Sequence, residues 1–138
     1  MQGAFRILLV GCGRALVKCF SIILETFGYQ QVDIELSCAG ALHKAQVQPP
    51  DVLIISDLMP EISGIETGLR ISHQSKCGVL FVSANYIEQE IRHLRAQGCV
   101  CTALPLPFEY TELLTKLQLL AVASKNSLGH VTDRPVRA

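Results

Sequence analysis

Short apolar runs alternate along the chain with longer segments in which apolar residues recur at helical spacing. The first run, residues 5–10, ends at Gly11; in the next segment, residues 14–27, apolar side chains recur every third or fourth position until Gly28. Runs of the first kind are typical of buried parallel strands, and the second pattern is typical of helices with one buried face. The alternation predicts strands at residues 5–10, 32–37, 52–55, 79–83 and 99–104, and helices at residues 14–27, 39–47, 64–73, 87–96 and 109–123.

Two of the predicted strands differ in the burial that their sequences indicate. Residues 52–55 are wholly apolar, which predicts a central strand, whereas residues 32–37 alternate apolar and acidic side chains, which predicts an edge strand with one solvated face. Because βα units with short connections form parallel sheets with right-handed crossovers, helices should cover both faces. The sequence therefore predicts an α/β fold, a doubly wound (βα)5 sandwich with a central five-stranded parallel sheet, in residues 5–123, and a flexible tail or linker at 124–138.

Composition narrows the classes of protein that fit this pattern. The 138 residues are 49% hydrophobic and 17% charged, which excludes a disordered chain. The 12 basic and 12 acidic residues give a formal net charge of zero without a basic cluster, so we expect no nucleic-acid binding through phosphate contacts. Six cysteines fall below the density of a disulfide scaffold. With no signal-peptide pattern and no apolar run near the ~18 residues of a membrane span, we expect a cytoplasmic protein.

Three short motifs follow the third, fourth and fifth predicted strands. Residues 51–64 read Asp-Val-Leu-Ile-Ile-Ser-Asp-Leu-Met-Pro-Glu-Ile-Ser-Gly, Ser83-Ala84 ends the fourth strand, and Pro107-Phe108 precedes the last helix. In this order the motifs resemble those of the receiver domain of two-component response regulators, and the resemblance covers about residues 5–122. It implies a flavodoxin-like fold and suggests a cis peptide bond between Leu106 and Pro107.

The pocket that this resemblance implies lacks most of its charged groups. In receivers, two acidic residues after the first strand hold Mg²⁺, an aspartate accepts the phosphoryl group, and a Ser or Thr and a Lys bind its oxygens. Here Gly11 and Cys12 stand in place of the acidic pair, and Leu106 stands in place of the lysine. Ser83 keeps the hydroxyl group, although we expect it to cap the next turn. The resemblance thus indicates a degenerate pseudo-receiver without catalytic residues, a metal site or a cofactor, in which Mg²⁺ binding is weak or absent.

The phosphoacceptor position has two alternatives, Ser56 and Asp57. Counting four residues back from Pro60 leads to Ser56, and counting forward from Pro50-Asp51 gives the same residue, whereas Asp57 fits only if the loop has lost one residue. A slip of one residue turns a strand side chain to the opposite face, so the two registers cannot share one pocket geometry. The spacing favours Ser56 at the acceptor site, and Asp57 is the phosphoacceptor if the domain is active.

These features predict a non-enzymatic signal-transduction module of two-component or phosphorelay type that acts by phosphorylation-independent protein–protein interaction. The resemblance implies that partners, or a second copy in a homodimer, dock on the face made by the fourth helix, the fifth strand and the fifth helix. The polar side chains of the fourth helix, Arg95 among them, are otherwise a solvated face. Two alternatives stay open: an atypical response regulator phosphorylated on Asp57, and a nucleotide-binding protein that uses the loop Gly11–Gly13, with Glu35 placed to bind a ribose.

The cysteines leave a redox role open as a further hypothesis. Cys12 would lie near a helix N-terminus, which lowers a thiol pKa and leaves a redox role open. Cys99 and Cys101 place alternate side chains on one face of a strand, which is not the spacing of a CxxC motif or a zinc site. We expect the last two to be buried, inert thiols.

Overall fold

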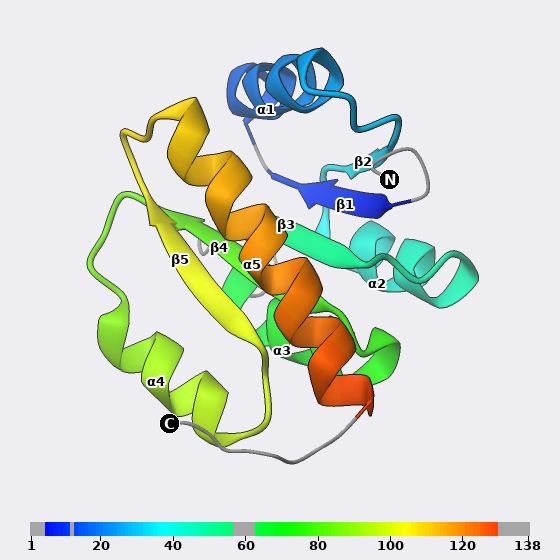
Figure 1. Cartoon of the computed structure of the whole chain (residues 1–138), viewed down its shortest axis with the longest axis vertical. Coiled ribbons are helices and arrows are strands. Elements are labelled where there is room, and N and C mark those ends of the chain that lie inside the picture. The colour runs from blue at the N-terminus through cyan, green and yellow to red at the C-terminus, as the bar shows by residue number, and fades with distance from the viewer. Residues whose placement is uncertain (1–4, 12, 57–62, 130–138) are drawn as a thin grey trace.

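The computed structural model of the 138-residue chain describes residues 5–11, 13–56 and 63–129, the last six of these by their backbone alone. Strands and helices alternate along the described residues (Figure 1). The elements are β1 (Arg6–Val10), α1 (Arg14–Thr26), β2 (Gln31–Glu35), α2 (Cys38–Val47), β3 (Val52–Ser56), α3 (Gly64–Ser75), β4 (Gly78–Ser83), α4 (Glu88–Ala96), β5 (Cys101–Pro105) and α5 (Tyr110–Gly129).

The strands form one parallel sheet in the order β2-β1-β3-β4-β5. The apolar strand β3 lies at the centre and β2 lies at an edge, as their sequences predict. This is the flavodoxin-type order, which differs from the 3-2-1-4-5-6 order of the Rossmann dinucleotide-binding fold. The predicted doubly wound sandwich is therefore confirmed.

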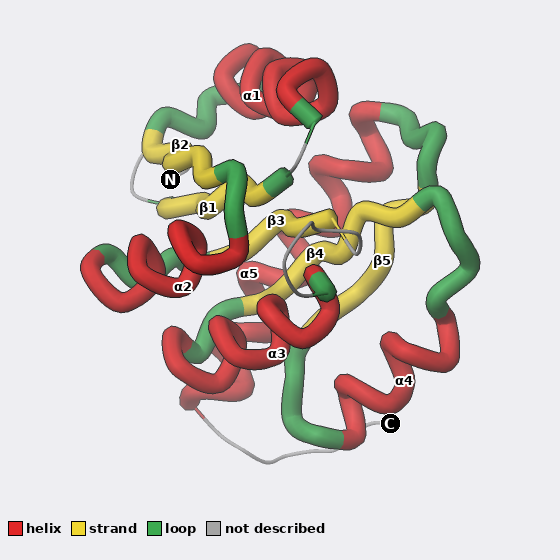
Figure 2. Tube along the Cα trace, turned by 180° about the vertical axis from the view of Figure 1, so that it is seen from behind, coloured by secondary structure: helices red, strands yellow, loops and turns green. Residues whose placement is uncertain are grey.

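Successive strand residues face two separate layers of helices. In β3, Leu53 and Ile55 belong to a core formed with α2, α3 and α4, whereas Val52 and Ile54 belong to a core formed with α1 and α5. Figure 1 shows α5 lying across one face of the sheet, and Figure 2 shows α2 and α3 in front of the other. Because both faces are covered, these four β3 side chains are at most 1% exposed.

Two predictions about the margins of the fold need correction. The alternating strand β2 does not bury all its apolar side chains, since Ile34 is 45% exposed and Leu36, just beyond the strand, is 44% exposed. The acidic side chains on the opposite face of β2 are only partly exposed, and one of them has cationic partners. Helix α5 continues to Gly129, so residues 124–129 are helical rather than part of a tail; extending a formed helix adds one hydrogen bond per residue without a new nucleation cost. Residues 130–138 lie outside the described residues.

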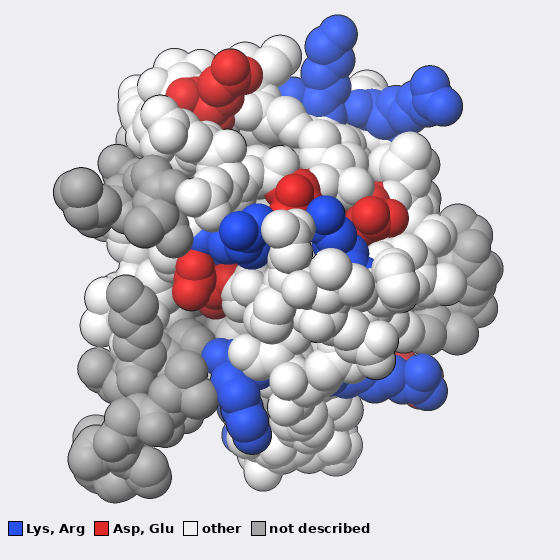
Figure 3. Space-filling model, turned by 90° about the vertical axis from the view of Figure 1, so that its right-hand side faces the viewer, with Lys and Arg blue, Asp and Glu red and all other residues white. Residues whose placement is uncertain are grey.

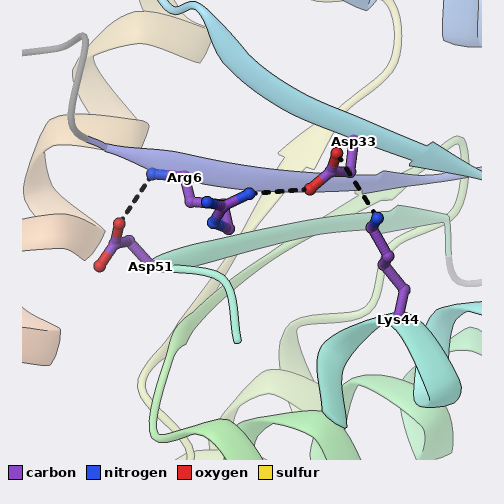
Figure 4. A network of polar contacts seen from close by, with 4 residues as sticks. All are labelled: Arg6, Asp33, Lys44 and Asp51. Carbon is purple, nitrogen blue, oxygen red and sulfur yellow. Dashed lines mark hydrogen bonds and ion pairs between the residues drawn. The ribbon is translucent and has the colours of Figure 1, made fainter. Parts of the chain in front are cut away.

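A polar network joins β1, β2, α2 and the residue before β3 (Figure 4). The Asp51 Oδ2 atom accepts a hydrogen bond of 2.7 Å from the backbone N–H of Arg6, and the Asp51 N–H donates to the Arg6 carbonyl at 2.8 Å. The Arg6 guanidinium lies 3.3 Å from Asp33 Oδ2, and Lys44 Nζ lies 3.9 Å from Asp33 Oδ1. The network fixes the start of β1 against the start of β3, away from the carboxyl ends of the strands.

Replacing Asp51 by alanine should destabilise the domain more than replacing Asp33 by alanine. Asp51→Ala leaves a backbone donor without its charged acceptor, which costs about 2 kcal/mol of unfolding free energy. Asp33→Ala removes only partly exposed ion pairs, which contribute about 0.5 kcal/mol. Urea unfolding of the two variants measures the difference, and equal losses would contradict this assignment.

Gly68 lets α3 pack closely on β4. A Cβ atom at this position would lie 2.7 Å from Cε1 and Cζ of Phe81. Gly68→Ala should therefore lower the unfolding free energy by roughly 1–3 kcal/mol through overpacking, although alanine is the better helix former by about 1 kcal/mol. In a Phe81→Leu background the smaller side chain leaves room for the added methyl group. Gly68→Ala should then lower the unfolding free energy by a smaller amount. A double-mutant cycle by urea unfolding tests this, and an unchanged cost would exclude the contact as its cause.

Candidate functional site

The carboxyl ends of β1, β3, β4 and β5 meet at the edge of the sheet where the sequence places the candidate pocket. Gly11 follows β1, Ser56 ends β3, Ser83 ends β4, and Leu106 follows β5. Strand pairing places Ser56 opposite Val82, and the backbone N–H of Leu106 donates to the Ser83 carbonyl at 2.9 Å. The structure thus brings these four predicted residues to one edge. The other two, Cys12 and Asp57, lie outside the described residues.

Gly11 and Ser56 occupy the same face of the sheet. Ser56 alternates with Ile55 and so points, like Ile54, toward the layer of α1 and α5. A Cβ atom on Gly11 would lie 3.0 Å from Cγ2 of Val17 in α1, so this position faces the same layer. This contact is tight, so a side chain at position 11 would require Val17 to shift by a few tenths of an ångström.

The Ser83 hydroxyl is engaged in the turn that follows β4. It accepts a hydrogen bond of 2.9 Å from the backbone N–H of Asn85 and lies 3.0 Å from the Asn85 carbonyl, to which it donates. Ser83 is only 2% exposed. The predicted capping of the next turn is therefore confirmed.

Leu106, which the resemblance aligns with the lysine of receivers, makes an apolar contact. It is partly buried against the core of α1 and α5, and the Leu106–Pro107 peptide bond is cis, as the resemblance suggests. Phe108 then stacks on Phe20 with ring centroids 4.9 Å apart and planes 7° apart. This packing places an aliphatic and an aromatic side chain just beyond the end of β5.

None of the four residues described at this edge carries a charge. Over residues 5–11, 13–56 and 63–129, no three His, Cys, Asp or Glu side chains are grouped so that they could hold a metal ion. The choice between Ser56 and Asp57 and the expectation of weak Mg²⁺ binding stay predictions, because they also depend on Cys12 and Asp57.

A second polar region covers the outer edge of β5. Arg95 Nε of α4 donates to the Cys101 carbonyl at 3.0 Å, and Lys116 Nζ of α5 donates to the Ala103 carbonyl. Arg95 is therefore more than part of a solvated face, because it satisfies a backbone acceptor of an edge strand. The role of Lys116 was not predicted from the sequence. Its one local signal is its spacing of four residues from Glu112, with which it forms an ion pair of 3.4 Å.

A pocket of about 450 Å³ lies between α4, β5 and α5. Arg95, Cys99, Cys101, Lys116 and Leu119 are among the residues that line it. Leu119 is 64% exposed, and Val122, one turn further along α5, is 59% exposed. This face therefore combines a hollow, two cations and exposed apolar side chains.

Three thiols lie in the core between the sheet and helices α3 and α4: Cys77, Cys99 and Cys101. The predicted burial of Cys99 and Cys101 is confirmed, at 2% and 4% exposure. Burial raises the pKa of Cys77 to about 12. The neighbouring Cys101 side chain lowers the pKa of Cys99 against the opposing effect of burial, and the same interaction raises the pKa of Cys101.

Charges of both signs are mixed on the face of the molecule that carries the edge of β2. In Figure 3, Lys and Arg side chains lie among Asp and Glu side chains, and the described residues of this face form no continuous basic area. Within the described ranges, no helix has both the length and the apolar character to cross a membrane.

Solved structures similar to this one are receiver domains. A CheY-like receiver domain protein of Methanospirillum hungatei gives a TM-score of 0.79 at 18% identity, covering 89% of this chain and 98% of that one. The chemotaxis protein CheY4 of Vibrio cholerae gives 0.75 at 26% identity, covering 84% and 98%. The signal receiver domain of a modulated diguanylate cyclase of Desulfovibrio desulfuricans gives 0.76 at 18% identity, covering 86% and 94%. No protein-family model and no curated protein matches the sequence. The chain has the CheY-like flavodoxin fold of response regulator receiver domains.

Stability should fall at alkaline pH because of Cys77. An unfolded thiol has a pKa of about 8.5, whereas the pKa in the folded protein is about 12. Between these values the unfolded chain releases a proton that the native state keeps, so unfolding becomes easier by about 1.4 kcal/mol per pH unit from this group. Urea unfolding against pH should show a shallower alkaline decline in Cys77→Ala than in the wild type, and parallel declines would contradict it.

Proposed function

We propose that the chain is a receiver-like module of a two-component or phosphorelay-type system that acts by protein–protein interaction without aspartyl phosphorylation. The observation that carries this proposal is the uncharged edge formed by Gly11, Ser56, Ser83 and Leu106. These positions are where the resemblance to receivers expects an acidic residue, the acceptor, a hydroxyl and a lysine.

Phosphoryl transfer depends mainly on neutralising charge. A metal ion and fixed cations stabilise the developing charge on the transferred group. The described edge offers the side chain of Leu106 instead of a cation, and Gly11 offers no carboxylate. A phosphorylated state would therefore have little to favour it over the resting state, and a ligand shifts an equilibrium only by its differential affinity.

The face of α4, β5 and α5 supports the docking part of the proposal. Its pocket lies beside the exposed side chain of Leu119, and Arg95 and Lys116 hold the edge of β5 in place. Exposed apolar side chains that surround a preformed hollow fit a protein partner better than a soluble metabolite. We propose a signalling protein as the partner, and a homodimer through the same face as the second option.

The domain is proposed to be non-enzymatic and to bind neither nucleic acid nor a cofactor. Among the described cysteines, Cys19, Cys38, Cys77, Cys99 and Cys101 are free thiols, which suits a reducing cytoplasm.

Two alternatives have different support. An atypical receiver phosphorylated on Asp57 keeps the same fold and needs only one carboxylate at the edge. A nucleotide site at Gly11–Gly13 has less support, because the strand order is not that of the dinucleotide-binding fold.

An amide NMR titration with Mg²⁺ and then beryllofluoride, a mimic of the acyl phosphate, tests the proposal. We expect the resonances of Ser56, Ser83 and α4 to stay unchanged, because the four residues described at the edge carry no charge that would bind either ligand. Shifts that spread from Ser56 and Ser83 to α4 would show a working phosphorylation switch.

A gain-of-function variant is the matched control for that titration. Ser56→Asp combined with Gly11→Asp, Cys12→Asp and Leu106→Lys restores the charged groups that the resemblance expects. This variant should gain Mg²⁺-dependent shifts at residues 56 and 83. A folded variant that stays silent would contradict the assignment of these positions.

A further inference from the structure

The outer face of α1 is exposed along the length of the helix. Its inner face packs on the sheet through Val17, Phe20 and Leu24. Figure 1 shows α1 at the margin of the molecule. The exposed residues recur three or four positions apart, so they share one side of the helix. They are Ala15, Lys18, Cys19, Ile22, Glu25 and Thr26. Ile22 lies at the centre of this face and is 54% exposed.

An apolar patch surrounds Ile22. Helix α1 and the beginning of α5 enclose a hollow of about 480 Å³, which Ile22, Phe27 and Tyr110 help to line. The rings of Phe27 and Tyr110 stack with centroids 5.3 Å apart, yet they are 41% and 51% exposed. Exposed apolar side chains that cluster in this way are typical of an interaction site, whereas single ones are ordinary.

The charges of α1 are placed against its helix dipole. Glu25 lies in the last turn, near the negative end of the dipole, and Arg14 lies in the first turn, near the positive end. Neither Lys18 nor Glu25 forms an ion pair with another described residue. These charges therefore weaken the helix by itself, and a second helix running in the opposite direction would turn them into attractions.

We propose that α1 is the interface of a symmetric dimer in which the two copies of the helix run antiparallel. Lys18 and Glu25 lie about 10 Å apart along the helix axis, and Ile22 is near the midpoint between them. A two-fold axis at Ile22 therefore places Lys18 of each copy beside Glu25 of the other, with the two Ile22 side chains in contact. In such a contact one surface supplies both members of each ion pair.

The shape of the face suits a second helix. Ala15, Cys19 and Thr26 have small side chains, which let two helix axes approach to about 8–10 Å. The antiparallel direction also places the positive end of each dipole beside the negative end of the other. A contact built on one helix from each copy is at the low end of interface sizes, so the dimer should dissociate on dilution.

This dimer is independent of the function proposed above. Its interface is separate from the face of α4, β5 and α5, which stays accessible to a signalling protein. The inference rests on the patch around Ile22 and on the charges of α1.

Sedimentation velocity of the full chain with dithiothreitol, from micromolar to near-millimolar concentration, measures the self-association. We expect an equilibrium between monomer and dimer. Ile22→Asp should abolish the dimer, because it places a charge at the centre of the apolar patch. Leu119→Asp is the matched control, since it replaces another exposed apolar side chain, of α5, and should leave the dimer intact.

Charge reversal tests the antiparallel register. Lys18→Glu and Glu25→Lys should each weaken the dimer roughly tenfold, because the two-fold axis turns both ion pairs into like-charge contacts. The double variant restores both pairs with the signs exchanged, and it should regain the dissociation constant of the wild type. Added salt should weaken the wild-type and double-variant dimers alike.

Three results would overturn the proposal. The first is a wild-type chain that sediments as a monomer at every concentration. The second is a dimer that Leu119→Asp dissociates and Ile22→Asp leaves intact, which would place the interface on the face of α4, β5 and α5. The third is a double variant of Lys18 and Glu25 that stays as weak as the single variants.

Circular dichroism checks that each variant is folded, and every substituted position is exposed. If Ile22→Asp does not fold, the charge reversal decides. A working magnesium switch would overturn the proposed function and leave this result unaffected.

Discussion

Strand β3 is buried on both faces, so it packs against both helix layers and holds them on one sheet. Four successive side chains, Val52 to Ile55, are at most 1% exposed, and each such burial contributes roughly 1.5–3 kcal/mol. The pairing of β3 with β1 and β4 then fixes which residues reach the carboxyl edge together. Since side chains alternate along the strand, a slip of one residue would exchange every position between the two cores. The identity of the pocket residues therefore follows from packing of the sheet.

Several charged side chains of the described residues stabilise the fold away from that edge. Asp51 and Arg6 fix the starts of β3 and β1, and Arg95 and Lys116 satisfy carbonyls on the free edge of β5. At the carboxyl edge, Gly11, Ser56, Ser83 and Leu106 carry no charge, and the described acidic residue there, Glu35, ends the neighbouring strand β2. This distribution favours a fixed surface over a phosphorylation switch, because charge supports the architecture and is missing from the described part of the pocket.

The pattern of apolar and polar residues predicted the helices and strands, and it also predicted that β3 is central and β2 is an edge strand. A strand buried on both faces is apolar throughout, whereas a strand with one solvated face alternates apolar and polar residues, so both cases leave a local signal. The exposure of Ile34 was not predictable, since it depends on how far α1 extends over the sheet edge. The same holds for the hydrogen bonds of Arg95 and Lys116 to carbonyls on β5, which join elements distant along the chain.

At the candidate site, the meeting of Gly11, Ser56, Ser83 and Leu106 was predictable from strand order alone. The pocket beside β5 was not, because side chains of α4 and α5, distant along the chain, line it together with residues of β5.

The most direct test of the central claim is the intact mass of the protein after incubation with acetyl phosphate and Mg²⁺. The account predicts an unchanged mass, because the described edge has no cation to stabilise a transferred phosphoryl group. A phosphoryl adduct that hydroxylamine removes, and that Asp57→Ala abolishes, would contradict the account and establish a phosphorylatable receiver.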